Sequence, residues 1–318
     1  MAKRSISGVL LLDKSYGITS NKALQKVKYL YESAKSGHTG TLDPLATGIL
    51  PICMGEATKF SSILLNANKT YEAVIKLGYQ STTGDAEGII EKLIEVGTTK
   101  LTIQYCETIL QQFVGETIQI PPMYSALKHR GKPLYFYARN GEVIEREPRT
   151  ILIHEIQIKS LFQNELTITV SCGTGTYIRT LAEDIGRALG CGGAYLIKLC
   201  RSSLGFFDLS QARKLEDLEE MDKGDRDYCL LPIDSILQDL PRVVLDKNET
   251  KNILQGRVLS EKPDLNDWAA QKSHDKSVRL YYRQLFLGLG EVTSEQTIKP
   301  KRLLSESHLI NQNQLQLN

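Results

Sequence analysis

The sequence predicts an α+β fold: a mixed, mostly antiparallel sheet flanked by helices and followed by a small β-rich domain. Strand-like and helix-like segments follow one another without the regular alternation that a parallel βαβ sheet requires. The chain has 318 residues, which favours one large domain and a small one. Beyond Leu240 short strand-like runs beside glycines replace the longer segments. We therefore place the domains at residues 1–235 and 240–318.

The first elements follow from the spacing of apolar residues. Residues 8–13 form a short apolar run that is typical of a buried strand. Ser20 precedes a helix. Its apolar side chains recur on one helical face at Ala23, Val27, Leu30 and Tyr31. Alternation between apolar and polar residues over 71–77 predicts a strand.

The later elements follow in the same way. A second helix carries Ile103, Cys106, Leu110 and Phe113 and ends near Gly115. Strands are predicted around residues 151–158 and 166–171, and a third helix over 178–189 is closed by Gly190. The acidic stretch from Glu216 to Asp227 resembles a boundary region. Within the small domain the strand-like pieces are residues 242–245 and 285–289.

Composition excludes several classes of protein. The chain is 41% hydrophobic and 24% charged, which is ordinary for a globular protein. It has no apolar run near the ~20 residues of a membrane helix and no leader-like start, so we expect a cytoplasmic protein. The six cysteines form no Cys-x-x-Cys pair, which favours buried free thiols over a metal site or disulfides.

Charge gives only a weak indication of a partner. The formal net charge is +2. Residues 1–70 nevertheless carry nine Lys and Arg against four Asp and Glu. Such a basic region fits a nucleic-acid partner, and it equally fits an ordinary solvated surface.

The most unusual segment runs from Gly37 to Gly48 and reads GHTGTLDPLATG. Its glycines allow the backbone to approach a ligand closely. Pro44 biases Asp43 away from helical geometry, so the carboxylate can point into a site. Asp43 could instead cap a helix that begins at Pro44. His38, taken alone, fits a hydrogen-bonded structural histidine equally well.

Three further segments carry candidate functional residues. Arg179 lies in the first turn of the third predicted helix, where the helix dipole disfavours a cation. It therefore needs a carboxylate or phosphate partner, unless it is a plain surface arginine. Tyr71 starts a predicted strand and fits either the core or a platform for a ligand. Residues 121–132 mix bases with an aromatic side chain, as strand-binding surfaces do.

These segments together resemble the bacterial tRNA pseudouridine-55 synthase family. The match is longest over residues 37–50, GHTGTLDPLATGIL. Further similar motifs follow in the order of the family: DKSYGITS at 13–20, KTY at 69–71, TGDAEG at 83–88, GTYIR at 175–179 and LCR at 199–201. The resemblance covers nearly all of residues 5–235. Beyond them it is faint and compatible with the small RNA-binding PUA domain.

The resemblance implies a fold, an activity and a set of site residues. It implies the pseudouridine synthase fold for residues 1–235 and the isomerisation of uridine 55 in the T loop of tRNA. Asp43 would be the catalytic aspartate, paired with Arg179, and Tyr71 would stack on the flipped base and help to take its C5 proton. The remaining implied residues are His38, which fills the space left by the base, Tyr177 and Leu199, which line the uracil pocket, and Lys14 and Asp85, which support the site.

The resemblance also sets expectations about cofactors and partners. Isomerisation needs no metal, nucleotide or redox cofactor, and we expect none. The expected partner is the T-arm stem-loop of tRNA, bound by a monomer without an obligatory protein partner. Two alternatives stay open, namely an RNA-guided subunit that modifies rRNA and a non-catalytic chaperone of tRNA folding. Ser15 and Cys200 stand where the family usually has Pro and Arg.

Overall fold

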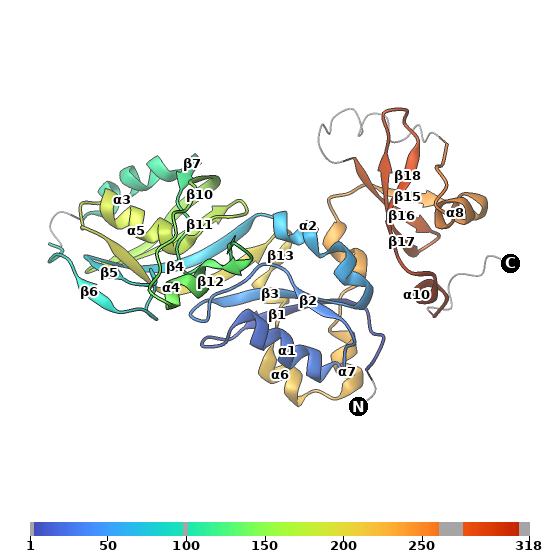
Figure 1. The fold of residues 1–318 in the computed structure, drawn as a ribbon, viewed down its shortest axis with the longest axis horizontal. Coiled ribbons are helices and arrows are strands. Elements are labelled where there is room, and N and C mark those ends of the chain that lie inside the picture. The colour runs from blue at the N-terminus through green and yellow to red at the C-terminus, as the bar shows by residue number, and fades with distance from the viewer. Residues whose placement is uncertain (1–2, 98–100, 261–275, 312–318) are drawn as a thin grey trace.

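The computed structural model describes residues 3–97, 101–260 and 276–311. A large sheet runs through the N-terminal part of the chain, and a smaller sheet forms a separate C-terminal domain at one end of the molecule (Figure 1). The fold class predicted from the sequence is confirmed, because helices flank a mixed sheet.

The large sheet has the strand order β14-β1-β3-β12-β4-β11-β10-β7, with β13 and β2 attached beside β12 and β3. Neighbouring strands are antiparallel except for the pairs β1–β14 and β3–β12. The strands are β1 (Gly8–Lys14), β2 (Ser36–His38), β3 (Thr47–Met54), β4 (Lys69–Leu77), β7 (Gly115–Gln119), β10 (Arg149–Phe162), β11 (Glu165–Cys172), β12 (Ala194–Leu204), β13 (Phe207–Asp208) and β14 (Arg213–Lys214). Two short hairpins lie outside this sheet, β5 (Tyr79–Ser81) with β6 (Ile90–Lys92) and β8 (Lys128–His129) with β9 (Lys132–Pro133).

The three helices that the sequence predicts begin close to the predicted positions, and further short helices are present that it does not predict. Helix α1 starts at Ser20 because the Thr19 side chain accepts a hydrogen bond from the Lys22 amide. The helices are α1 (Ser20–Leu30), α2 (Ser61–Asn66), α3 (Ile103–Leu110), α4 (Leu134–Arg139), α5 (Ile178–Ala188), α6 (Leu215–Glu220) and α7 (Lys223–Tyr228). Short 3₁₀ helices accompany them at η1 (Gly55–Phe60), η2 (Gln111–Phe113), η3 (Leu209–Gln211) and η4 (Ile233–Leu237).

The acidic stretch from Glu216 to Asp227 belongs to the body of the large domain. It forms most of α6 and α7, and Lys26 of α1 pairs with Glu219 at 3.3 Å. The Tyr31 hydroxyl donates to the Arg226 carbonyl over 2.7 Å. These contacts hold the stretch against the N-terminal helix, so it is not a linker.

The C-terminal domain contains a sheet of order β15-β16-β17-β18. Its elements are β15 (Arg242–Leu245), α8 (Lys247–Leu254), β16 (Ser277–Tyr282), β17 (Leu285–Val292), β18 (Ile298–Leu303) and α10 (Glu306–Asn311). Both strands predicted here, at 242–245 and 285–289, are present. The boundary between residues 235 and 240 stays a prediction.

Strand β1 supplies two hydrophobic cores at once. Leu10 and Leu12 face the core beneath α1 and α5, whereas Val9 and Leu11 face a second core that continues into the C-terminal sheet. A strand buried on both faces is apolar at successive positions. This is why residues 8–13 show no alternation.

Candidate active site

Asp43 lies in the connection between β2 and β3. The residues after it turn for three positions and enter β3 at Thr47, so no helix begins at Pro44. The alternative of a helix cap is therefore wrong. The Asp43 side chain is 37% exposed, which leaves the carboxylate open to a ligand.

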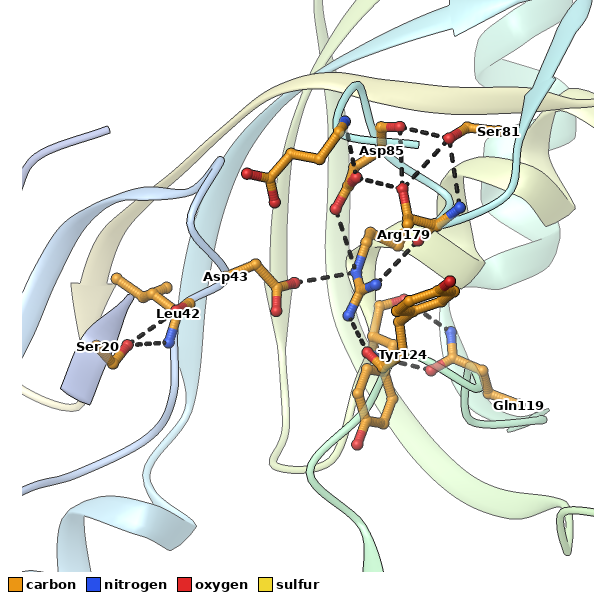
Figure 2. A network of polar contacts seen from close by, with 11 residues as sticks. Ser20, Leu42, Asp43, Ser81, Asp85, Gln119, Tyr124 and Arg179 are labelled. Carbon is orange, nitrogen blue, oxygen red and sulfur yellow. Dashed lines mark hydrogen bonds and ion pairs between the residues drawn. The ribbon is translucent and has the colours of Figure 1, made fainter. Parts of the chain in front are cut away.

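The segment that carries Asp43 is fixed on both sides by hydrogen bonds. The buried Ser20 hydroxyl accepts from the Leu42 amide and donates to the Leu42 carbonyl, both at 2.8 Å. On the other side the Gly17 amide donates to the Pro44 carbonyl over 2.8 Å. Both anchors come from residues near the start of α1, and Figure 2 shows the one between Ser20 and Leu42. The backbone at Asp43 is therefore held in place before any ligand arrives.

Arg179 reaches this carboxylate from the first turn of α5. Its Nε lies 2.9 Å from Oδ2 of Asp43, and its side chain is only 6% exposed. The two terminal nitrogens donate to the carbonyls of Thr83 at 2.9 Å and Tyr124 at 2.7 Å. Figure 2 shows the guanidinium at the centre of this network. Its orientation is thus set by three separate segments, and the cation at the helix start has the anionic partner that the dipole requires.

Asp85 supports Arg179 from the turn after β5. Its Oδ2 lies 3.9 Å from the Arg179 Nε, and its side chain is buried. The other oxygen, Oδ1, accepts from the Thr83 hydroxyl at 2.6 Å and from the Glu87 amide at 3.1 Å. Because these donors fix Asp85, its charge holds the guanidinium toward Asp43.

Burial raises the pKa of the Asp43 carboxyl above its ordinary value. The positive charges of Arg179 and Lys14 oppose this effect, whereas Asp85 adds to it. A group that charges less readily than an ordinary aspartate is a recognised feature of catalytic carboxylates.

Tyr71, Leu199 and Tyr177 come from three different elements. Tyr71 is on β4 and Leu199 on β12, where Leu199 lies opposite Ala73. Residues two apart on one strand share a face of the sheet, so Tyr71 and Leu199 line the same side. Tyr177 is half-buried at the start of α5, where its amide donates to Oε1 of Gln119 at 2.8 Å. Asp43 is one of several charges that act on the pKa of both tyrosines, in each case raising it.

Lys14 of β1 supports the Asp43 segment, and His38 ends β2 at the start of that segment. The fully buried Lys14 ammonium donates to the carbonyls of Ser15 at 2.9 Å and Ile18 at 2.8 Å, and to that of Pro44 at 3.4 Å. Burial lowers its pKa to about 8. Burial also lowers the pKa of His38, as does the charge of Arg201, which favours the neutral imidazole.

Two supporting residues could be found only from the structure. Gln119 binds both the amide and the carbonyl of Tyr177, with distances of 2.8 and 3.1 Å. Arg201 is buried and donates to the carbonyls of Ile49 and Gly40. The sequence shows Arg201 inside a motif but gives no sign that its partners are backbone carbonyls. For Gln119 it offers no signal at all.

The basic segment at residues 121–132 contacts the site through its backbone, not through the basic side chains that the sequence suggests. Its contact with the site is a backbone one, since the Tyr124 carbonyl accepts from Arg179. Lys128 and Lys132 belong to the β8–β9 hairpin, and both are exposed. They are open to a polyanion without touching Asp43.

The described residues hold no group of three or more His, Cys, Asp or Glu side chains placed to bind a metal ion. In the same residues no helix is both long and apolar enough to span a membrane.

Comparison with known proteins shows three matching family models along the chain. Residues 28–178 match the N-terminal domain of TruB family pseudouridylate synthases. Residues 179–238 match the C-terminal domain of tRNA pseudouridylate synthase B, and residues 241–304 match the C-terminal part of pseudouridine synthase II TruB.

Similar whole proteins and structures were also found. The tRNA pseudouridine synthase B of Nitrosospira multiformis is 56% identical over 306 residues, which cover 95% of this chain and 97% of that protein. The protein of the same name from Methylobacillus flagellatus is 50% identical, with coverage of 96% and 97%. A chain in a crystal structure of a Cbf5-Nop10-Gar1 complex has the same fold, with a TM-score of 0.68, 23% identity and coverage of 94% and 84%. The identity to full-length relatives, together with the three family matches in sequence order, shows that this chain belongs to the TruB family of pseudouridine synthases.

Proposed function

We propose that this chain converts uridine 55 in the T loop of tRNA to pseudouridine, with Asp43 as its catalytic residue. The observation that carries the proposal is the ion pair of 2.9 Å between Asp43 and Arg179, within a chain of this family. The curated relatives named above are tRNA pseudouridine synthases. The open carboxylate and the exposed bases of the β8–β9 hairpin suit an RNA ligand.

The reaction keeps all atoms of the substrate except for one proton. The bond between N1 and C1′ breaks, the uracil turns, and a bond forms between C5 and C1′. The C5 proton then leaves, and its electron pair restores the C5–C6 double bond while N1 acquires a proton. Asp43 starts this sequence, either by attacking C1′ or by removing a proton from C2′.

The other residues have roles that fit their positions. The target base is stacked in the folded loop, so it has to be flipped out at a cost of a few kcal/mol. Stacking on an aromatic side chain such as Tyr71 returns about 1–3 kcal/mol. Leu199 and Tyr177 would line the uracil pocket, and His38 would occupy the space left by the base. Arg179 and Asp85 hold the carboxylate, and Lys14 supports the backbone behind it.

The test is release of tritium from a T-arm stem-loop labelled at C5 of uridine, with no other protein or guide RNA added. The wild-type chain should release tritium, and replacement of uridine 55 by cytidine should abolish release. Asp43→Asn keeps the shape of the side chain and removes its charge, so it should bind the stem-loop within about threefold of wild type yet release no tritium.

The matched control is Asp184→Asn. Asp184 lies on the same helix as Arg179 and pairs with Arg187 on the surface, at 2.6 Å, so this variant should keep full activity. Turnover by Asp43→Asn would end the carboxylate mechanism. A requirement for guide RNA would support the RNA-guided alternative, and correct tRNA folding without any tritium release from wild type would support a chaperone.

A further inference from the structure

Arg201 is the largest of the fully buried side chains and has no role in the mechanism given above. It lies on β12, between β3 and β4, opposite Gly48 on one side and Tyr71 on the other. Within the described residues no carboxylate lies within ion-pair distance of it, in contrast to Arg179. A buried cation is costly unless hydrogen bonds or charges compensate for it, so its position calls for a physical reason.

The Arg201 guanidinium is fixed by two backbone carbonyls, one before and one after Asp43 in the sequence. Its Nε donates to the Ile49 carbonyl at 2.8 Å, and one terminal nitrogen donates to the Gly40 carbonyl at 3.3 Å. Two glycines make room for this arrangement. A Cβ at Gly48 would lie 2.3 Å from the Arg201 carbonyl, and one at Gly40 would lie 3.2 Å from the guanidinium. Both have positive φ, +98° and +78°, which glycine adopts readily.

The Arg201 side chain lies on the same face of the sheet as the Tyr71 phenol, because the two residues are paired across β12 and β4. Residues directly opposite on neighbouring strands project to the same face of a sheet, so the two side chains lie together. Burial raises the pKa of Tyr71, whereas the charge of Arg201 and a hydrogen bond with it lower that pKa. Cys172 on β11 and Asp43 are the other titratable groups that act on the phenol, and both oppose its ionisation.

We propose that Arg201 is a positioning residue of the reaction, held by the Gly40 and Ile49 carbonyls so that its charge stabilises the phenolate form of Tyr71. This rests on the proposed function, in which Tyr71 helps to remove the C5 proton. The phenol first loses its proton to water. The phenolate oxygen then takes the proton from C5, and the C–H electron pair restores the C5–C6 double bond.

The sign of the pH dependence follows from this arrangement. A cation beside a phenol lowers its pKa, so loss of the Arg201 charge raises the pKa of Tyr71. The rate of C5-proton removal rises with pH up to that pKa. Without the charge the rise should shift to higher pH, and the rate near neutral pH should fall.

The experiment compares Arg201→Gln, which donates hydrogen bonds without a charge, with Arg201→Lys, which keeps the charge on a smaller group. Single-turnover rates are measured from neutral to alkaline pH with stem-loops carrying hydrogen or deuterium at C5.

Arg201→Gln should lower the rate at neutral pH at least about thirtyfold, or about 2 kcal/mol of barrier. It should also increase the deuterium isotope effect above that of wild type. Arg201→Lys should recover part of the rate, and the pH at which its rate rises should lie closer to that of wild type. Binding of the stem-loop should change less than about threefold, since phosphate contacts dominate affinity.

The control is Arg226→Gln. Arg226 also donates to backbone carbonyls, those of Leu30 at 2.7 Å and Asp222 at 3.3 Å, but it packs against the end of α1 away from Tyr71. It should alter neither the isotope effect nor the pH profile. A second measurement uses the double variant that carries both Arg201→Gln and Tyr71→Phe. The loss of rate caused by Arg201→Gln should be much smaller in Tyr71→Phe than in wild type.

Each outcome decides the proposal. An unchanged isotope effect and pH profile in folded Arg201→Gln would reduce Arg201 to a structural residue. The same holds if both Arg201 variants fail to fold while the Arg226 variant folds, or if the losses at Tyr71 and Arg201 simply add. The proposed function fails differently, because wild type itself would then release no tritium.

Discussion

At the scale of single residues, the site depends on a buried guanidinium whose orientation is fixed by the protein. All three nitrogens of Arg179 contact protein acceptors, on Asp43, Thr83 and Tyr124. The side chain is only 6% exposed, so it is poorly placed to bind a phosphate of the substrate. We therefore expect Arg179 to orient the Asp43 carboxylate and to favour its charged form. We expect most of the binding energy for the RNA to come from other surfaces of the molecule.

Arg179→Lys should separate orientation from charge. Lysine keeps the charge that opposes the raised pKa of Asp43 but loses the planar donor geometry, so it cannot bind Asp43 and both carbonyls together. We expect turnover to fall at least tenfold, or about 1.4 kcal/mol of barrier, while affinity for the stem-loop changes less. Single-turnover rates and filter binding on the same RNA measure the two effects.

Arg187→Lys is the matched control, because Arg187 lies on the same helix and pairs on the surface with Asp184. It should keep the wild-type rate. A variant Arg179→Lys that binds RNA far more weakly yet reacts normally once bound would instead identify Arg179 as a phosphate contact.

The sequence alone predicts these residues only in part. The helix dipole at Arg179 requires an anionic partner, but position in the chain cannot choose between Asp43, Asp85 and a phosphate. The choice depends on how β3 and α5 are brought together by the sheet. Arg201 is harder still, because its partners are carbonyl oxygens of Gly40 and Ile49, and backbone atoms leave no pattern in a sequence.

At the scale of elements, the catalytic segment is held between α1 and β3. Ser20 begins α1 and binds both polar backbone groups of Leu42, the residue directly before Asp43. The start of the helix and the carboxylate therefore form one unit. This connects helix capping around Thr19 and Ser20 with the chemistry at Asp43.

Ser20→Ala should damage both stability and rate. It leaves the buried amide and carbonyl of Leu42 without a partner, at about 1–3 kcal/mol for each group. We expect a melting temperature lower by roughly 4 °C or more and a slower single-turnover reaction, because Asp43 loses its anchor. Thermal unfolding and single-turnover kinetics are the measurements.

Ser33→Ala tests whether the effect on rate is specific. Ser33 is also buried, and its hydroxyl donates to the Lys35 carbonyl at 2.9 Å, but it does not bind the Asp43 segment. It should lower stability and leave the rate at saturating RNA unchanged. Equal loss of rate in both variants would mean that Ser20 acts through stability alone.

The local pattern predicts some strands of the large sheet and misses others, among them β3 and β12. Alternation reveals β4, and a double-sided apolar run reveals β1. Strand β12 escaped prediction although it lies at the centre of the sheet. Its sequence, AYLIKLCRSSL, mixes polar and charged residues, because it pairs with β3 and β4 beside the site and carries Arg201 inward. The polar and charged side chains of β12, Arg201 among them, thus hide the regular pattern of apolar residues that would predict a strand.

At the scale of the whole molecule, the C-terminal domain packs directly on the element that follows β3. Phe60 of η1 meets Phe286 of β17 edge-on, with ring centres 5.7 Å apart. Val9, Leu11 and Ile49 of the large sheet share a core with Leu245 and Leu280 of the small one. Removal of the C-terminal domain would expose this apolar surface, so truncation is a poor test of what the domain does.

Two charged residues of η1 connect the large domain to the small one, and we call this contact the joint. Oε2 of Glu56 accepts from the Lys59 ammonium at 2.8 Å and from the Ser305 amide at 2.7 Å. Lys59 also donates to the Leu303 carbonyl at 3.1 Å. One ion pair in the large domain therefore holds two backbone groups at the end of β18. It fixes the orientation of the small domain relative to the sheet that carries Asp43.

Glu56→Ala should loosen this joint without touching the site. It leaves Lys59 and the Ser305 amide without their shared acceptor, at about 1–3 kcal/mol of stability. If the small domain binds RNA at a fixed distance from Asp43, a looser joint lowers the effective concentration of the second contact. We expect affinity for full-length tRNA to fall severalfold while the single-turnover rate at saturating tRNA stays at the wild-type value.

The control is Glu291→Ala, which breaks the pair with Lys299 inside the small domain. It should leave both the affinity and the saturated rate unchanged. A fall in the saturated rate of Glu56→Ala would show that the joint transmits strain to the Asp43 segment through β3, and that the two domains act as one catalytic unit.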